Sequence, residues 1–252
     1  MTKNIMSKFE NYLLELQSSP NTIKSYVSDI NTYFKYLNIE PTILERESVK
    51  SYKQYLQDEL NLDAKTINRK LSSLKRYNEF LIKDLYQNEI VILSSDYTKI
   101  QKSYSSPTRV TCDEAKKFIQ KIKRNESYRN YAIVQVIANT GLRISEVLSL
   151  RVNNIYLEDY EATIVGKGNK QRIVALSDKA VEVINEYINN HRDKSKYAKQ
   201  SPYLFVSNKG NKLEPTTIQR IFKKYSDGRI TPHDLRHVFA TKYLKDGNDI
   251  RL

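Results

Sequence analysis

The chain has 252 residues and carries 42 Lys and Arg against 29 Asp and Glu, which gives a formal net charge of +13. An excess of this size favours a polyanionic partner, although merely basic proteins without one are common. A single cysteine excludes an internal disulfide, no run approaches the roughly 18 apolar residues of a membrane span, and no apolar secretory core stands near the N-terminus, so a cytoplasmic protein is expected.

Residues 1–98 are expected to form a first, all-helical domain, since a chain of this length has room for two domains with separate cores. Apolar residues recur at helical spacing in four segments of this region. The first segment includes Leu13, the second begins at Ser19, the third covers residues 47–60 and the fourth follows Asp63.

The fourth predicted helix carries basic side chains between its apolar positions, at Lys65, Arg69, Lys70, Lys75 and Arg76. Such a face is usually only solvated. Beside DNA it would supply phosphate contacts, which fix the position of a protein on the duplex without reading its sequence. These residues are therefore candidate DNA contacts.

Residues 99–110 are expected to be a linker, because they are polar, lack an apolar period and contain a proline. Thr111 and Glu114 then form a capping-box pattern, which predicts the start of a new helix. The remainder, residues 111–252, is expected to be a second domain of mixed α and β structure.

Two polar segments of the second domain contain glycines. Thr140–Leu150 places Arg143 and Glu146 three residues apart, a spacing that by itself predicts only an ion pair within one helical turn. A tight turn is expected between two β-like runs, Ala162–Val165 and Arg172–Leu176.

The predicted turn contains Lys167 and Lys170 and ends at Arg172. The glycines on either side of Lys167 are typical of a phosphate loop, but the segment does not fit the Walker pattern, so nucleotide binding is rejected. Judged by itself, Lys167 is an exposed lysine in a turn.

A third segment, Thr231–Thr241, predicts a helix start. Thr231 is a good N-cap, a proline fits the first helical position, and Asp234 stands where a carboxylate completes a capping box. His233 and Arg236 share one face at this helix N-terminus, which suits a phosphate. The alternative is an arginine paired with a nearby carboxylate beside a histidine of the capping region.

In this order, the motifs Thr-Gly-Leu-Arg-x-Ser-Glu, Gly-Lys-Gly-Asn-Lys-x-Arg and Pro-His-x-Leu-Arg-His resemble those of the tyrosine recombinase (phage integrase) superfamily, particularly its compact Xer-like members. The resemblance covers most of the chain. It implies a multidomain fold, with an all-α SAM-like core-binding domain followed by a mixed α+β catalytic domain that contains a small β-sheet. It also implies site-specific recombination, of the integrase or transposon resolvase type, through a 3′-phosphotyrosine.

The resemblance also implies roles for individual residues. Arg143 and Arg236 match the two arginines that hold the non-bridging phosphate oxygens. Lys167 matches the lysine that protonates the departing 5′-oxygen, and His233 matches a histidine that carries a proton or contacts the phosphate. Glu146 matches a position that is often acidic and that supports the active-site arginine or lysine.

The implied partner is duplex DNA with paired recognition sites, on which the recombinase self-associates as a tetramer, with no membrane involved. Lys170 and Arg172 join the helical basic residues as candidate DNA contacts. No metal and no other cofactor is expected, because the arginines hold the phosphate and the phosphotyrosyl bond conserves the energy for rejoining.

The sequence departs from the family pattern after Thr241. Residues 246–252 resemble the lead-in to the family's Leu-Gly-His segment, but the second histidine and the nucleophilic tyrosine have no counterpart among these residues. Tyr243 is the nearest tyrosine, yet it matches an ordinary helical position and is expected to be structural. The 252 residues are therefore expected to bind DNA but to be deficient in cleavage.

Three explanations of the missing nucleophile stay open: a tail that is cut off or disordered, a natural truncation, or a nucleophile supplied by a neighbouring protomer. The first is favoured. Two other functions also compete with recombination. One is a non-catalytic DNA-binding regulator on the same scaffold, and the other is a type IB topoisomerase, which uses a similar site without paired recognition sequences.

Overall fold

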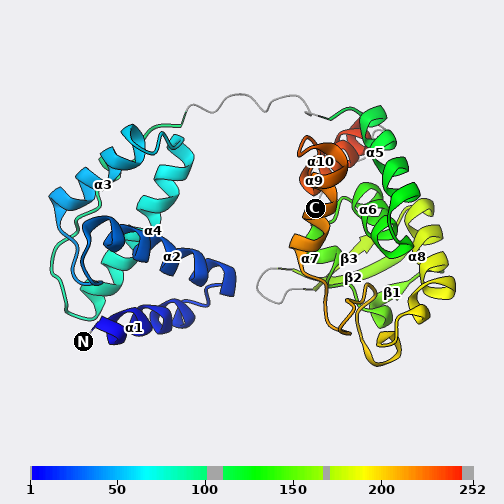
Figure 1. Ribbon diagram of the computed structural model, residues 1–252. Coiled ribbons are helices and arrows are strands. Elements are labelled where there is room, and N and C mark those ends of the chain that lie inside the picture. Colours follow the sequence, from blue (N-terminus) through cyan, green and yellow to red (C-terminus); the bar gives the residue numbers. More distant parts are fainter. Residues whose placement is uncertain (1, 101–109, 167–170, 246–252) are drawn as a thin grey trace. The chain divides into compact units, whose positions relative to one another are not determined.

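The computed structural model describes residues 2–100, 110–166 and 171–245. The chain divides into two compact units, Met1–Tyr104 and Ser105–Leu252, each with its own hydrophobic core (Figure 1). The expected fold class is confirmed, because the first unit is helical and the second combines helices with a small sheet. No helix within the described ranges is long and apolar enough to cross a membrane.

The first unit contains α1 (Thr2–Glu15), α2 (Pro20–Leu37), α3 (Arg46–Asp58), α4 (Ala64–Lys83) and the short 3₁₀ helix η1 (Ser94–Asp96). Side chains cap the starts of two of these helices. The Ser19 hydroxyl accepts a hydrogen bond from the backbone N–H of Thr22 at 3.2 Å, and the Asp63 carboxylate accepts one from that of Thr66 at 2.6 Å. Both caps satisfy backbone donors that the first helical turn leaves free.

Helix α4 packs against the other three long helices of the unit. Aromatic rings fill much of the space between them, and Tyr33, Tyr52, Tyr77 and Phe80 are almost fully buried. The ring of Tyr33 meets that of Tyr52 edge to face, with centroids 5.1 Å apart. Such contacts add to the stabilisation that burial of the rings provides.

The second unit contains α5 (Cys112–Asn125), α6 (Tyr128–Thr140), α7 (Ile144–Val147), α8 (Asp178–Asn190), α9 (Pro215–Ser226) and α10 (Pro232–Lys245). Its shorter 3₁₀ helices are η2 (Val152–Asn154), η4 (Arg192–Lys194) and η5 (Ala198–Gln200). Its strands are β1 (Ile155–Tyr156), β2 (Glu161–Val165) and β3 (Gln171–Ala175). The capping box predicted at the start of α5 is confirmed, because the Thr111 hydroxyl and the Glu114 carboxylate each accept the other residue's backbone N–H.

The three strands form an antiparallel sheet in the order β1-β2-β3. The β-like runs predicted from the sequence are confirmed, with β2 and β3 both starting one residue earlier and β3 also ending one residue earlier. In the register of the hairpin, Ile164 faces Arg172 and Val165 faces Gln171. This register decides which side chains of β3 share the buried face of the sheet.

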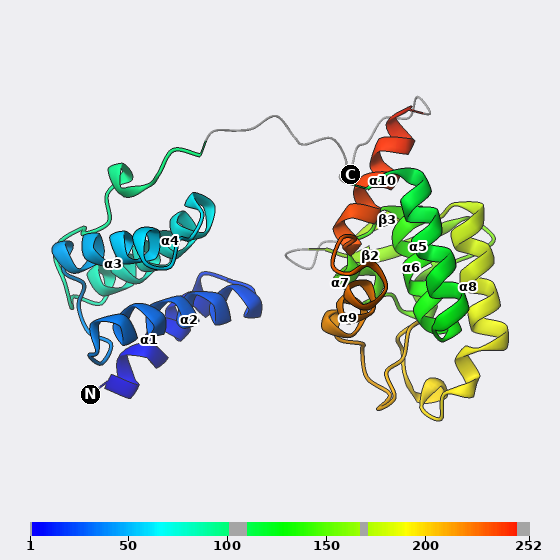
Figure 2. The same ribbon diagram turned by 45° about the horizontal axis from the view of Figure 1, so that its top comes forward.

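Helix α6 lies at the centre of the second unit, where it packs against α5, α8 and α10 (Figures 1 and 2). Its residues from Asn130 to Ile137 are all buried, which agrees with the apolar run in the sequence. The short helix α7 follows it and lies beside the ends of β2 and β3 in both views. α7, β3 and α10 therefore meet around one end of α6.

Candidate active site

The turn between α6 and α7 carries the first candidate residue. It begins at Gly141, which has a left-handed φ of +62°, and a Cβ at this position would lie 2.6 Å from Cδ1 of Phe239 on α10. A glycine is therefore needed for α10 to pack so closely on the turn. Leu142 is buried next to it, and the side chain of Arg143 follows with 62% of its surface exposed.

Glu146 anchors Arg143 through both of its carboxylate oxygens. The backbone N–H of Arg143 donates to Oε2 at 2.8 Å, and Nη1 of its guanidinium donates to Oε1 at 3.2 Å. Glu146 is only 8% exposed, so this carboxylate depends on its partners for compensation of its charge. The ion pair that the sequence predicted within one helical turn is therefore present.

Arg172, on β3, reaches the same carboxylate. Its Nη2 donates to Glu146 Oε1 at 3.3 Å, so the guanidiniums of Arg172 and Arg143 share a single oxygen. The Nε of Arg172 is buried and has no hydrogen-bond partner. This contact joins β3 to α7 and brings a second arginine to the site.

Helix α10 supplies the third arginine. The predicted capping box is confirmed, because the Asp234 carboxylate accepts from the backbone N–H of Thr231 at 2.8 Å and the Thr231 hydroxyl accepts from that of Asp234 at 3.3 Å. Leu235 is buried in the core, and Arg236 follows with its Nη1 enclosed and without a hydrogen-bond partner. The capping box fixes the start of the helix, and the buried Leu235 anchors the helix one residue before the arginine.

Electrostatics places the three arginines and the glutamate in one group, which we call the arginine cluster: Arg143, Arg172, Arg236 and Glu146. Burial lowers the pKa of the Arg236 guanidinium, and the positive charges of Arg143 and Arg172 lower that pKa further, while Glu146 opposes them. Guanidiniums stay charged at neutral pH despite such shifts. Three positive charges therefore face one carboxylate, and the excess of positive charge suits an anion.

His233 and His237 stand on α10 beside the cluster in sequence. Both side chains are exposed, and their rings meet edge to face with centroids 4.4 Å apart. The spacing of three residues between His233 and Arg236 puts these two on one face of the helix, as predicted. His237 thus contacts the candidate catalytic histidine.

Lys167 and Lys170, the candidates in the β2–β3 turn, lie outside the described residues. Tyr243 is described, and its ring stacks on that of Phe239 with centroids 5.6 Å apart. Phe239 is the ring that covers Gly141, and Tyr243 is 39% exposed beside it on the same helix.

The basic residues of α4 lie in the first unit and differ in their surroundings. Lys65 and Lys75 are exposed. Arg76 pairs with Glu79 at 2.7 Å on the same helix. Arg69 and Lys70 both bind the carboxylate of Asp29 on α2, through Arg69 Nη2 at 3.0 Å and Lys70 Nζ at 3.1 Å.

Asp29 is a buried polar residue that the sequence interpretation did not single out. Burial by itself would raise the pKa of its carboxyl group, but hydrogen bonds from Arg69, Ser73 and Lys70 outweigh burial and hold this pKa below its usual value. A signal was present in the sequence, because Asp29 stands three residues after Tyr26 and four before Tyr33, on the apolar face of α2.

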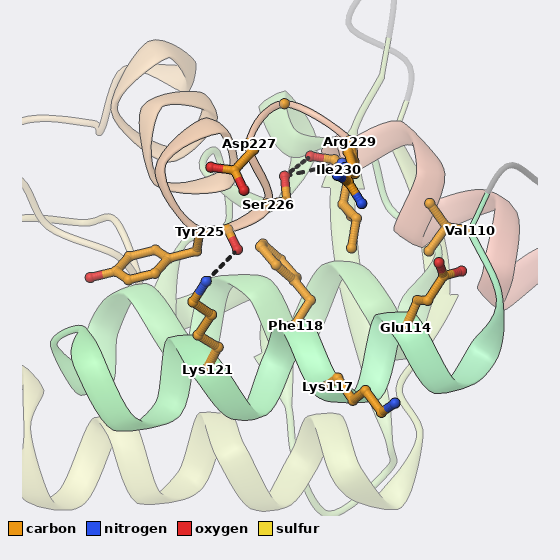
Figure 3. A pocket seen from close by; sticks show the side chains of 11 residues that line it. Val110, Glu114, Lys117, Phe118, Lys121, Tyr225, Ser226, Asp227, Arg229 and Ile230 are labelled. Carbon is orange, nitrogen blue, oxygen red and sulfur yellow. Dashed lines mark hydrogen bonds between the residues drawn. The ribbon is translucent and has the colours of Figure 1, made fainter.

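A separate cleft of about 650 Å³ lies between α5 and the turn that joins α9 to α10 (Figure 3). Lys121 closes part of it by donating from Nζ to the backbone oxygen of Tyr225 at 3.2 Å. Lys117 and Phe118 also line it. Of the candidate residues that the structure describes, none belongs to this lining.

Comparison with known proteins gives matches over both units. Residues 108–252 match the phage integrase family, and residues 6–84 match the N-terminal SAM-like domain of phage integrases. TnP I resolvase of Bacillus thuringiensis is 41% identical over 252 residues, which cover 98% of this chain and 88% of that protein. Tyrosine recombinase XerD of Oceanobacillus iheyensis is 32% identical over 251 residues, which cover 95% of this chain and 84% of that protein.

Among solved structures, a lambda integrase tetramer bound to a Holliday junction superposes with a TM-score of 0.70 over 98% of this chain and 74% of that chain. Its sequence is 18% identical, so this likeness concerns the fold alone.

Proposed function

The chain is a site-specific tyrosine recombinase of the phage integrase family, and we propose that it breaks and rejoins DNA strands through a 3′-phosphotyrosine formed at the arginine cluster. The observation that supports this site is the gathering of three guanidiniums, from the α6–α7 turn, β3 and α10, around one buried carboxylate, which pairs with the first two and acts electrostatically on the third. Two of these guanidiniums hold buried donors without partners, as a site prepared for an anion would.

The proposed chemistry explains the excess of positive charge. When a tyrosine oxygen attacks the phosphorus of a phosphodiester, the non-bridging oxygens gain negative charge in the transition state. Arg143 and Arg236 would hold these oxygens with directed, charge-assisted hydrogen bonds that strengthen as the charge grows. The loss of one such group typically costs about 10²–10³ in rate, or roughly 3–4 kcal/mol.

Lys167 and His233 would carry out the proton transfers of the reaction. As the bond between phosphorus and the 5′-oxygen breaks, Lys167 would give a proton to that oxygen, and His233 would exchange a proton or contact the phosphate nearby. Rejoining is the same step in reverse, with the 5′-hydroxyl attacking the phosphotyrosine, and it needs no added energy source. Glu146 would keep Arg143 in place throughout.

We place the nucleophile on a tyrosine other than those within residues 1–252. Tyr243 stands seven residues after Arg236, which corresponds to about 10 Å along the helix axis. Its ring is stacked on Phe239, four residues earlier on the same helix. The nucleophile would then come from a segment beyond these residues or from a neighbouring protomer.

The proposed partner is duplex DNA with paired recognition sites, bound by four copies of the chain at the moment of strand exchange. The tetrameric lambda integrase on a Holliday junction provides an arrangement of this kind on the same fold. The 41% identity to TnP I resolvase favours resolution of joined DNA over integration as the outcome. The cytoplasmic location inferred from composition stays a prediction.

A nicked suicide substrate tests the proposal, because the nick lets a short strand diffuse away after cleavage and traps the covalent protein–DNA adduct. The substrate would carry the binding site found by footprinting the DNA that flanks the gene. Protein from the complete reading frame is expected to form the adduct, whereas residues 1–252 are expected to bind the same DNA and form none. An adduct formed by residues 1–252 would show that one of their own tyrosines is the nucleophile.

Failure of every form to cleave, with specific binding retained, would instead favour the non-catalytic regulator. Relaxation of supercoiled DNA that lacks paired sites would favour a topoisomerase.

A further inference from the structure

Arg172 occupies an unusual position for an arginine. Strand β3 places Arg172 and Val174 on the face that turns toward the core, and Arg172 stands opposite Ile164, which is buried. The neighbouring Ile173 points outward and is 64% exposed. The strand therefore exposes an isoleucine and turns an arginine inward, which reverses the usual distribution and costs stability.

The pairing with Glu146 compensates only part of this cost. Arg172 donates one hydrogen bond to Glu146, from Nη2, and its Nε is buried without a partner. A buried donor without an acceptor loses its hydration and gains nothing in return. If Arg172 served only as a counter-ion for Glu146, its Nε would not need to be buried without a partner. Nor would the guanidinium of Arg143 need to bind the same carboxylate oxygen.

The charges of the arginine cluster also indicate a site for an anion. Glu146 is already compensated by Arg143, through both the backbone N–H and the guanidinium. The positive charge added by Arg172 disfavours the charged form of Arg236, so the protein maintains a repulsion within the arginine cluster. A bound anion would remove this repulsion and accept the unused donors.

We propose that Arg172 is a third phosphate-contacting arginine of the active site, which binds a non-bridging oxygen of the phosphodiester together with Arg143 and Arg236. The side chain is 35% exposed, so part of the guanidinium can reach a ligand while Nη2 stays on Glu146. This assignment rests on the proposed function, since it adds one residue to the same anion site. It differs from a general contact with the DNA backbone, because the bound phosphate is the one that reacts.

The first test follows the arginine Nε–Hε signals by NMR while inorganic phosphate is added at constant ionic strength. Each signal is assigned from its loss in the corresponding Arg→Lys variant. The signals of Arg172, Arg143 and Arg236 are expected to shift with one common half-saturation, and that of Arg220, an exposed residue of α9, is expected to stay unchanged. A stationary Arg172 signal beside moving Arg143 and Arg236 signals would overturn the assignment and leave the proposed function intact.

If no signal of the arginine cluster moves, the cluster is not an anion site, and the proposed function fails together with this assignment. Sodium chloride at the same ionic strength controls for screening.

The second test separates contact with phosphate from an effect through Glu146. Arg172→Gln is expected to weaken phosphate binding about tenfold, as the loss of a hydrogen bond from a charged group implies. The same loss is expected when Glu146→Gln is already present, because Arg172 would act on the anion itself. An effect of Arg172→Gln that disappears in the Glu146→Gln chain would show that Arg172 only positions Glu146.

Arg220→Gln is the matched control and should leave the affinity unchanged. The dispersion of the amide signals shows whether each variant is folded, and the titration of the unmodified chain tests the assignment without any substitution.

Discussion

Single carboxylates organise the positive charge in both units of the protein. Glu146 gathers Arg143 and Arg172 in the second unit, and Asp29 gathers Arg69 and Lys70 in the first. Each carboxylate is buried, so it fixes its partners more firmly than a surface ion pair would. The two sites differ in their unused hydrogen-bond donors. The arginine cluster retains buried N–H groups without partners, whereas Asp29 accepts hydrogen bonds from Arg69, Lys70 and Ser73.

The buried carboxylate of Asp29 should make the first unit sensitive to acid. Its folded-state pKa is held below the usual value, so its charge stabilises the folded state above the unfolded pKa, and this contribution is lost as the pH falls through the folded pKa. Asp29→Asn is expected to destabilise the unit by about 1–3 kcal/mol at pH 7, and by much less in acid. The measurement is the urea midpoint of NMR signals from α2 and α4 across pH.

The control for this prediction is Asp58→Asn on α3, an exposed aspartate, which should leave the midpoint unchanged. A deficit of Asp29→Asn that stays constant down to strongly acid pH would contradict the assigned charge state.

At the scale of elements, the packing of α10 on the α6–α7 turn brings Arg143 and Arg236 together. Phe239 covers Gly141 so closely that a Cβ cannot fit without a shift. The sequence predicts the two ends of this contact separately, as a glycine before an arginine and as a capped helix. Their meeting depends on the path of the chain between them, which local patterns do not contain.

Substitution of Gly141 measures this contact. Gly141→Ala combines the strain of a left-handed backbone with a clash against Phe239, and it is expected to cost about 2–4 kcal/mol. Gly228→Ala is a matched control, because Gly228 also has a left-handed φ, of +77°, but open space where the Cβ would lie. The measurement is native-state hydrogen exchange of the α6 and α10 amides.

Gly228→Ala should cost only the backbone strain, about 1–2 kcal/mol, and Phe239→Leu should relieve part of the Gly141→Ala effect. Equal losses for the two alanine variants would show that Phe239 does not hold the turn.

Local patterns predicted some elements better than others, for physical reasons. The caps at Thr111 and Thr231 were predictable because a capping box involves residues close in sequence. The elements that were not identified include α7, a single turn of four residues, and β1, a strand of two residues. Segments this short have no period of their own, and tertiary contacts stabilise them.

At the scale of the whole molecule, the net charge of +13 predicts a polyanionic partner, but it does not identify the basic side chains that contact this partner. The basic residues of α4 looked equivalent in the sequence. In the structure, Lys75 is exposed, whereas Lys70 is 15% exposed and bound to Asp29. This difference could not be read from the sequence, because Asp29 lies on another helix, 41 positions away.

DNA binding should reflect this difference. If Lys75 contacts a phosphate, Lys75→Gln should reduce the slope of log affinity against log salt by about one. Lys70→Gln should leave the slope nearly unchanged and instead destabilise the first unit, because it removes a partner of a buried carboxylate. Binding isotherms at several salt concentrations measure the slopes. A slope that falls by one for Lys70→Gln at unchanged stability would mean that Lys70 leaves Asp29 to contact DNA.

We propose that the arginine cluster stabilises the transition state of strand cleavage. The most direct measurement compares adduct formation and DNA affinity for Arg143→Gln and Arg236→Gln in protein from the complete reading frame, on the nicked suicide substrate. Each variant is expected to form the adduct at least about 10²-fold more slowly, while its affinity stays within a few-fold of the unmodified protein, because affinity is spread over many phosphate contacts. Parallel losses of affinity and cleavage across a salt titration would contradict the claim and reduce these arginines to ordinary DNA contacts.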